Sequence, residues 1–495
     1  MSKQNLTLVF VHGYSVVDLT TYGELPLRLK NEAAARNINL EVEEIFLGKY
    51  ISFQDEVKLA DVSRAFQSAI HIQLKKLLDK GGRFMCITHS TGGPVVREWF
   101  QFYYAGKKEV CPMSHLIMLA PANFGSALAQ LGKGRLSRMK TWFQGVEPGQ
   151  GVLDWLELGS KDAWEVNEDW IFKGENYIGN DQTFPFVLTG QSIDRKFYDH
   201  LNAYTGELGS DGVIRVAAAN LNSRYINLVQ TADRLNISKY QEAPKTAFRI
   251  ISGKAHGGDT MGIQNSVKKR LTDKKSQETV DSIFRCIQVN DKASYTKLTK
   301  AFAEENIIVQ ERELVEKQEK RFVKDRFFIH DRYFQVIFKV TDEQGYPVND
   351  FDLLLLGPNH DPGNLPEGFF KDRQRNQICP NVITYYFNFD LMVGCEAVID
   401  PESKKVIREA QPGISELGVQ VIPRPQDGFV RYMPCTLHAH TELMDKMVDP
   451  NSTTMLEIKL KRLVSDKVFQ LVPVEGDKMP KENFKKTKCG EGLVE

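Results

Sequence analysis

The segment RFMCITHSTGG, residues 83–93, carries the strongest structural signal in this chain. Its first part, Arg83–Thr88, is a short apolar run that predicts a buried strand, and Gly92–Tyr104 predicts a helix directly afterwards. Ser90 therefore lies in a tight strand-to-helix turn, from which its hydroxyl projects at the end of a sheet. The helix N-terminus offers N–H groups that can stabilise a developing oxyanion. We interpret Ser90 as a nucleophile whose turn is shaped by His89, Gly92 and Gly93.

Strands and helices alternate on both sides of this turn. This alternation predicts a mostly parallel sheet with helices on both faces, an α/β fold. The expected strands are Leu6–Val11, Leu40–Phe46, His115–Ala120, Phe184–Thr189, Tyr225–Val229 and Ala247–Ile251, and the expected helices include Pro26–Arg36, Leu59–Leu78 and Ser276–Val289.

The pattern changes twice along the chain. Residues from about 123 to 182 are rich in glycine and aromatic residues, and they are either an ordinary excursion or a cap over a site. After a charged helical stretch, Lys292–Lys320, short alternating runs separated by Gly and Pro turns predict a β-rich, sandwich-like domain. We expect a catalytic domain at residues 1–290, a helical linker at 291–325, a β-rich accessory domain at 326–475 and a flexible tail at 476–495. The expected β-domain strands are Phe334–Val340, Phe351–Leu356, Val382–Phe389, Gly418–Ile422 and Met455–Leu460.

Composition excludes several classes of protein. The 495 residues contain 64 basic and 64 acidic side chains, so the net charge is zero and bulk nucleic-acid binding is not expected, although a local basic patch stays open. Seven scattered cysteines without a CxxC pair fit a reducing compartment. No apolar run is long enough for a transmembrane helix or a signal peptide, which predicts a cytoplasmic chain as synthesised, with signal-independent export left open.

No cofactor or metal is expected. No phosphate-binding glycine loop follows the first strand. His438 and His440 would share one face of a strand, but no third ligand with a clear spacing accompanies them, so the sequence predicts no metal site.

A second motif, VHGY at residues 11–14, ends the first strand. An oxyanion hole needs one N–H from the residue after the nucleophile and another from a strand-end loop. These requirements assign the backbone N–H groups of Thr91 and Tyr14, with His12 and Gly13 shaping the loop.

Together with SDGVI at residues 210–214, these motifs resemble the α/β-hydrolase superfamily, and most closely its lipase branch. That branch includes bacterial lipases, GPI-deacylase-like hydrolases and type VI secretion lipase effectors. The resemblance covers about residues 5–275 and departs from the usual Gly-x-Ser-x-Gly pattern at Thr88, which stands where the first glycine is usual. LAPANFGS at residues 119–126 is loosely similar to a lipase turn.

The resemblance implies the chain order Ser, Asp or Glu, His. His256, in the glycine-rich loop SGKAHGGD, is our choice for the general base. Asp211 is our choice for the acid, Asp194 is the alternative acid, and Asp199 is a weaker rival.

The implied activity is that of a serine hydrolase that cleaves lipid acyl esters through an acyl-enzyme. Two alternatives stay open: a soluble carboxylesterase or thioesterase, and a catalytically silent hydrolase fold used for binding. The implied partner is a lipid or another acyl ester, with peripheral membrane contact and a protein partner for the C-terminal domain left open.

Overall fold

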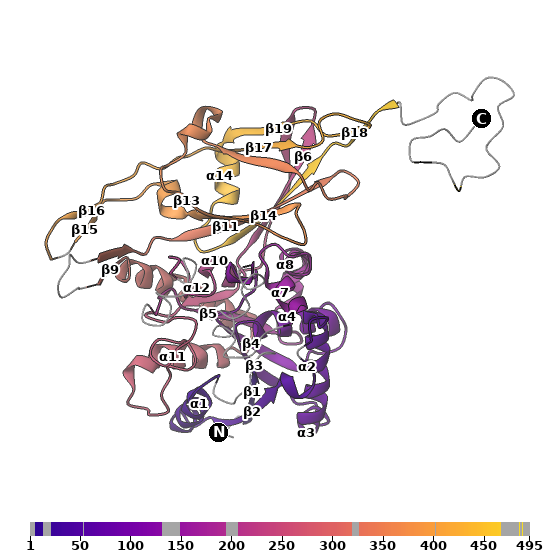
Figure 1. Cartoon of the computed structure of the whole chain (residues 1–495). Helices are drawn as coiled ribbons and strands as arrows, with labels where there is room; N and C mark the ends of the chain where they lie inside the picture. Colours follow the sequence, from indigo (N-terminus) through magenta and orange to yellow (C-terminus); the bar gives the residue numbers. More distant parts are fainter. Residues whose placement is uncertain are drawn as a thin grey trace.

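The computed structural model describes residues 5–12, 21–52, 54–130, 149–194, 206–318, 326–400 and 402–466, together with Lys485 and Lys488. Figure 1 shows two sheets, one in the lower, N-terminal half and one in the upper half. No helix in these described ranges is both long and apolar enough to cross a membrane.

The first sheet is parallel throughout and has the strand order β2-β1-β3-β4-β5-β8. The central strands are buried along nearly their whole length, as expected where helices cover both faces. Figure 1 shows α1 and α11 on one side of this sheet and α2 and α4 on the other, which confirms the α/β prediction. The strands are β1 (Asn5–His12), β2 (Asn39–Phe46), β3 (Phe84–His89), β4 (Met113–Leu119), β5 (Phe184–Thr189) and β8 (Ala247–Ile250).

Helices pack around this sheet, and further helices lie along the chain between its strands and those of a second sheet. The single helix expected at Leu59–Leu78 is divided at Leu74 into α2 and α3. Within the expected cap, α7 and α8 bury Trp155, Trp164 and Trp170, while residues 131–148, with Trp142, lie outside the described residues. The helices are α1 (Leu25–Ala35), α2 (Leu59–Gln73), α3 (Lys75–Leu78), α4 (Gly92–Tyr103), α7 (Gln150–Leu156), α8 (Lys161–Lys173), α10 (Val216–Ala219), α11 (Lys274–Ile287), α12 (Lys292–Arg312), α13 (Phe389–Val393) and α14 (Thr441–Met447), with short 3-10 turns at Leu47–Lys49, Gly174–Tyr177, Pro358–His360 and Pro362–Asn364.

The second sheet has nine strands in the order β12-β17-β19-β7-β6-β20-β11-β14-β13, which confirms a β-rich C-terminal region. It curls around its own apolar core. The curl brings β14 beside β12, where the Tyr385 hydroxyl donates to the Leu353 carbonyl at 3.0 Å. The strands are β6 (Arg224–Thr231), β7 (Arg234–Glu242), β11 (Tyr333–Asp342), β12 (Phe351–Leu356), β13 (Phe370–Arg375), β14 (Val382–Asn388), β17 (Leu417–Pro423), β19 (Cys435–His440) and β20 (Thr453–Leu460). Short two-stranded sheets pair β9 (Val315–Gln318) with β10 (Arg326–Ile329), β15 (Val398–Ile399) with β16 (Val406–Arg408), and β18 (Val430–Arg431) with β21 (Leu463–Val464).

One strand assignment was wrong. Tyr225–Val229 was expected in the first sheet, but it belongs to β6, which pairs with β7 and β20 in the middle of the second sheet. An apolar run indicates a strand but not its pairing partner, and here the partner β20 lies more than 200 residues away. The second sheet is therefore built partly from residues that precede position 290.

Arg215 ties the two halves of the molecule together. Its buried guanidinium donates to both Glu207 oxygens, at 2.8 and 2.9 Å, and to Asp372 on β13 at 2.5 Å. It also lies 4.0 Å above the ring of Tyr386 on β14, whose hydroxyl donates to the carbonyl oxygens of Leu208 and Gly209. The segment 206–220 is thus held against the second sheet.

We predict that Arg215→Met lowers the free energy of unfolding by about 3–5 kcal/mol, since it leaves the mostly buried carboxylates of Glu207 and Asp372 without their cation. Urea unfolding followed by circular dichroism measures the change. Arg424→Met is the matched control: this arginine also pairs with two aspartates, Asp350 and Asp352, but at the surface, where ion pairs contribute little. Equal stability of the two variants would contradict the assigned role of Arg215.

Candidate active site

Ser90 occupies a strained turn between β3 and α4. Its φ angle is +54°, in the left-handed region that side chains other than glycine seldom adopt. The turn is held by its own backbone: the Ser90 N–H donates to Leu119 O at 3.0 Å, and Ser90 O accepts from the N–H groups of Gly93 and Ala122 at 3.2 and 3.3 Å. The strain is thus compensated by packing against the end of β4, and the serine is fixed at the carboxyl edge of the sheet.

The two glycines after the turn allow close packing. A Cβ atom at Gly93 would lie 2.7 Å from the Pro121 side chain, and one at Gly92 would lie 3.3 Å from the Thr88 Cβ. Thr88 is the residue that departs from the usual glycine of the motif. Its fully buried side chain is accommodated because it faces Gly92, which has no side chain of its own.

The structure brings Ser90, His256 and Asp211 into one hydrogen-bonded chain. His256 Nε2 lies 3.1 Å from Ser90 Oγ, and His256 Nδ1 lies 3.0 Å from Asp211 Oδ2. Asp211 is fully buried and His256 is only 4% exposed. These are the contacts that proton transfer from a serine hydroxyl to an oriented imidazole requires.

The Asp211 carboxylate is fully occupied. Its Oδ1 accepts from the backbone N–H groups of Val213 and Ile214, at 3.0 and 2.7 Å, which leaves Oδ2 for the imidazole. The backbone adds a further link, since the His256 N–H donates to Asp211 O at 2.9 Å. These bonds fix the orientation of the carboxylate, which suits a group that must orient the imidazole.

The alternative acid, Asp194, lies on the loop after β5. It is buried, and its Oδ2 accepts from the hydroxyl of Thr260, in the same loop as His256, at 2.7 Å. The structure therefore places Asp211, and not Asp194, against the His256 ring. Asp199 lies outside the described residues.

His89 connects the nucleophile turn to the His256 loop, a contact that the sequence did not predict. Its Nε2–H donates to His256 O at 2.9 Å, and its Nδ1 lies 3.4 Å from Gln264 Nε2. Burial, and then the nearby His256, hold the pKa of His89 well below its usual value. His89 is therefore neutral, with one nitrogen donating and the other accepting. No local pattern identifies Gln264, because its partner lies 175 residues earlier.

The second sequence motif is described only in part. His12 is buried, with its ring stacked on Phe46 at 4.1 Å and edge-on to Tyr22 at 4.9 Å. Thr91 is buried at the start of α4. Gly13 and Tyr14 lie outside the described residues, so the assignment of the oxyanion hole to the N–H groups of Tyr14 and Thr91 stays a prediction.

The pair His438 and His440 has other contacts. His440 Nδ1 accepts from the Leu443 N–H and caps α14, and the ring of His438 lies 4.4 Å from that of His360. In the part of the chain that the structure describes, no three candidate ligands lie close enough together to hold a metal ion.

Comparison with known proteins identifies the family to which this chain belongs. No family model and no curated protein sequence matches it. The solved structure of phospholipase PlaB from Legionella pneumophila is similar over 95% of this chain and 97% of its own, with 40% identity and a TM-score of 0.84. The chain belongs to the PlaB phospholipase family.

Two further structures were found. The structure of PlaB in complex with thio-NAD matches over the same shares, with 38% identity and a TM-score of 0.82. The match to the mature lipase BlEst2 from Bacillus licheniformis covers 44% of this chain and 79% of the lipase, with 15% identity and a TM-score of 0.32. PlaB matches both sheets, so the β-rich region also belongs to the family architecture. The comparisons give no support to the resemblance to type VI effectors.

The low pKa of His89 predicts a stability change with pH. An unfolded histidine titrates near pH 6.5, so below about pH 6.5 the unfolded chain binds a proton that folded His89 does not. The stability that His89 contributes is complete above that pH and falls as the pH drops. We expect a smaller loss in His89→Gln than in the parent when urea unfolding is compared at about pH 7.5 and about pH 5.5. Equal losses would contradict this assignment.

Proposed function

We propose that this chain is a serine phospholipase in which Ser90 attacks an acyl ester of a phospholipid. The hydrogen-bonded chain Ser90–His256–Asp211, with Asp211 buried and fully paired, carries the proposal. Membership of the PlaB family supports the substrate class, because PlaB is itself a phospholipase.

The geometry supports a two-step mechanism. As Ser90 Oγ attacks the carbonyl carbon, His256 Nε2 takes the hydroxyl proton, and Asp211 keeps the imidazole in the tautomer that carries its proton on Nδ1. His256 then gives the proton to the leaving alcohol oxygen, which yields an acyl-enzyme and the lysolipid. Water then attacks the acyl-enzyme carbonyl while His256 takes its proton. The bond to Ser90 Oγ breaks, and His256 returns the proton to Oγ as the fatty acid leaves.

Neighbouring groups complete the proposed site around these three residues. The N–H groups at the start of α4 lie beside Ser90, and we assign the Thr91 N–H together with that of Tyr14 to the developing oxyanion. His89 acts as a positioning residue, because it holds the His256 carbonyl and neutralises no charge.

We predict that Ser90→Ala removes hydrolysis of both a short p-nitrophenyl ester and phosphatidylcholine vesicles, a loss on the order of 10⁶ in kcat. Asp211→Asn should lose about 10⁴, since the amide no longer holds the active tautomer. Asp194→Asn is the matched control, a buried carboxylate in the same region that should retain most activity.

The outcomes are distinct. Equal losses in the two aspartate variants would leave Asp194 as an acid, and activity in Ser90→Ala would overturn the mechanism. Cleavage of the short ester with none of the vesicles would favour a soluble esterase.

The thio-NAD complex of PlaB supports a second proposal, that this chain also binds a dinucleotide. No Rossmann glycine motif follows the first strand, so such a site would not bind the dinucleotide pyrophosphate with the usual glycine-rich loop. We expect the thermal midpoint of the full chain to rise with increasing NAD, as for any ligand that binds the folded state alone. AMP is the matched control, and an unchanged midpoint at saturating NAD would refute this proposal.

A further inference from the structure

The segment Lys268–Lys275 concentrates positive charge in a chain of zero net charge. Five of its eight residues are basic and one, Asp273, is acidic. The basic residues are all exposed: Lys268, Lys269, Arg270, Lys274 and Lys275. Lys269 lies 3.5 Å from Glu24, and none of the other four forms an ion pair with another described residue. We call this segment the basic loop.

Side chains of α1 hold the backbone of the basic loop in place. The fully buried Arg28 guanidinium donates to the carbonyl oxygens of Lys268, at 3.1 Å, of Arg270 and of Leu271, and to Gln277 Oε1 at 2.8 Å. Asn31 Nδ2 donates to the remaining carbonyl, that of Lys269, at 3.2 Å. Four successive carbonyl groups are thus turned towards α1.

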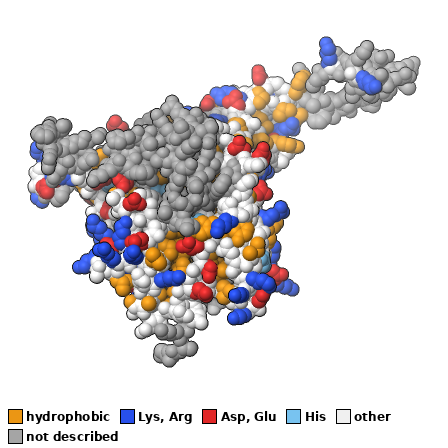
Figure 2. All heavy atoms as spheres, turned by 60° about the horizontal axis from the view of Figure 1, so that its bottom comes forward, with side chains coloured by type: hydrophobic (Ala, Val, Ile, Leu, Met, Phe, Trp, Pro, Cys, Tyr) orange, Lys and Arg blue, Asp and Glu red, His pale blue; other side chains and the backbone are white. Residues whose placement is uncertain are grey.

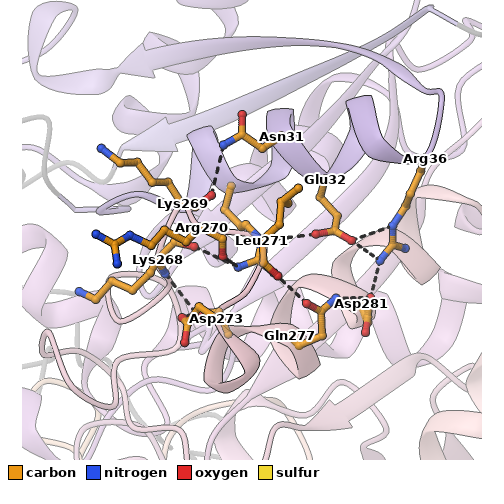
Figure 3. Close-up of polar contacts among 12 residues, drawn as sticks. Asn31, Glu32, Arg36, Lys268, Lys269, Arg270, Leu271, Asp273, Gln277 and Asp281 are labelled. Atoms are coloured by element: carbon orange, nitrogen blue, oxygen red, sulfur yellow. Dashed lines mark hydrogen bonds and ion pairs between the residues drawn. The ribbon is translucent and has the colours of Figure 1, made fainter.

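This anchoring turns the side chains outwards. Figure 3 shows the ends of Lys268, Lys269 and Arg270 side by side on one side of the loop, away from the polar contacts that involve Glu32, Gln277 and Asp281. Because the loop backbone is already fixed, the three cations are presented together without a further cost of ordering that backbone on binding.

Exposed leucines accompany the charges. Leu271, in the loop, is 47% exposed, and Leu27, on the adjacent α1, is 52% exposed. Figure 2 shows the molecule with the bottom of Figure 1 turned forward, and on this face hydrophobic side chains lie among Lys, Arg and acidic side chains. Cations that surround exposed apolar side chains match the interface of a bilayer, in which the cations meet anionic headgroups and the apolar groups leave water.

The basic loop continues from the loop that carries His256. Gln264, which contacts His89 next to Ser90, precedes Lys268 by four residues, so their Cα atoms lie within about 14 Å of each other. A surface that binds at Lys268 therefore lies within four residues of chain of the Gln264–His89 contact, which is next to Ser90 in the sequence.

We propose that the basic loop, with Leu27 and Leu271, docks this protein on an anionic phospholipid bilayer. The proposal rests on the proposed phospholipase function, to which it adds the charge of the surface on which the substrate lies. A nucleic acid would also meet the charges, but it offers no apolar phase for the two leucines.

Vesicle flotation of the full chain with Ser90→Ala tests the docking without turnover. We expect binding to vesicles of phosphatidylcholine mixed with phosphatidylglycerol and weak binding to phosphatidylcholine alone. Binding should fall in about 1 M salt, where charges are screened within about 3 Å. Each basic residue at an anionic surface contributes about fivefold in affinity, so Lys268→Gln/Arg270→Gln/Lys274→Gln should bind about 100-fold more weakly.

Three controls accompany the triple variant. Lys76→Gln/Lys80→Gln/Lys108→Gln removes as many exposed charges elsewhere and should bind like the parent. Lys268→Arg/Lys274→Arg keeps the charge and should retain binding. Leu271→Ala should weaken binding without changing its salt dependence, and an unchanged thermal midpoint shows that each variant is folded.

Parent-like binding by the triple variant would overturn the proposal, and so would equal losses in the two glutamine triples or salt-independent binding to phosphatidylcholine alone. The outcome is separable from that of the catalytic proposal. Charge-dependent flotation with no Ser90-dependent hydrolysis refutes only the phospholipase mechanism, and hydrolysis without charge-dependent flotation refutes only the docking.

Discussion

The buried carboxylate of Asp211 is the constraint on which the rest of the site depends. A fully buried charge is tolerated only where its oxygens are paired, and here two backbone N–H groups and one imidazole pair them. The segment that presents Asp211 is held by Arg215, whose partner Asp372 belongs to the second sheet, 157 residues further along the chain. The C-terminal sheet is therefore part of the support of the catalytic geometry, and the two halves of the molecule act as one unit.

A second set of contacts organises the serine and the imidazole. The positive φ of Ser90 is an unfavourable local conformation that persists because β4 and α4 hold both of its ends. His89, one residue earlier, reaches across to the His256 carbonyl, so the nucleophile turn and the base loop are fixed by adjacent residues of one strand end. This arrangement requires a neutral His89, and burial supplies that state by lowering its pKa.

The loop after β8 has two roles at its two ends. Near its start it presents His256 to Ser90, and at its end it presents the basic loop to solvent, where α1 holds the loop backbone. α1 in turn follows the segment that contains Tyr14, our proposed second oxyanion donor.

The sequence by itself determined the strand-turn-helix around Ser90 and the α/β class, because these depend on short-range patterns of apolar and glycine residues. The candidates for base and acid came from the resemblance to lipases. It favoured Asp211 over Asp194 only through the resemblance of SDGVI to a lipase segment, and it assigned Tyr225–Val229 to the wrong sheet. Only the tertiary structure shows which carboxylate contacts the His256 ring and which sheet β6 joins, together with the contacts of His89, Gln264 and Arg215. The physical reason is the same in each case: a hydrogen bond or a strand pairing is defined by its partner, and these partners lie 45 to more than 200 residues away.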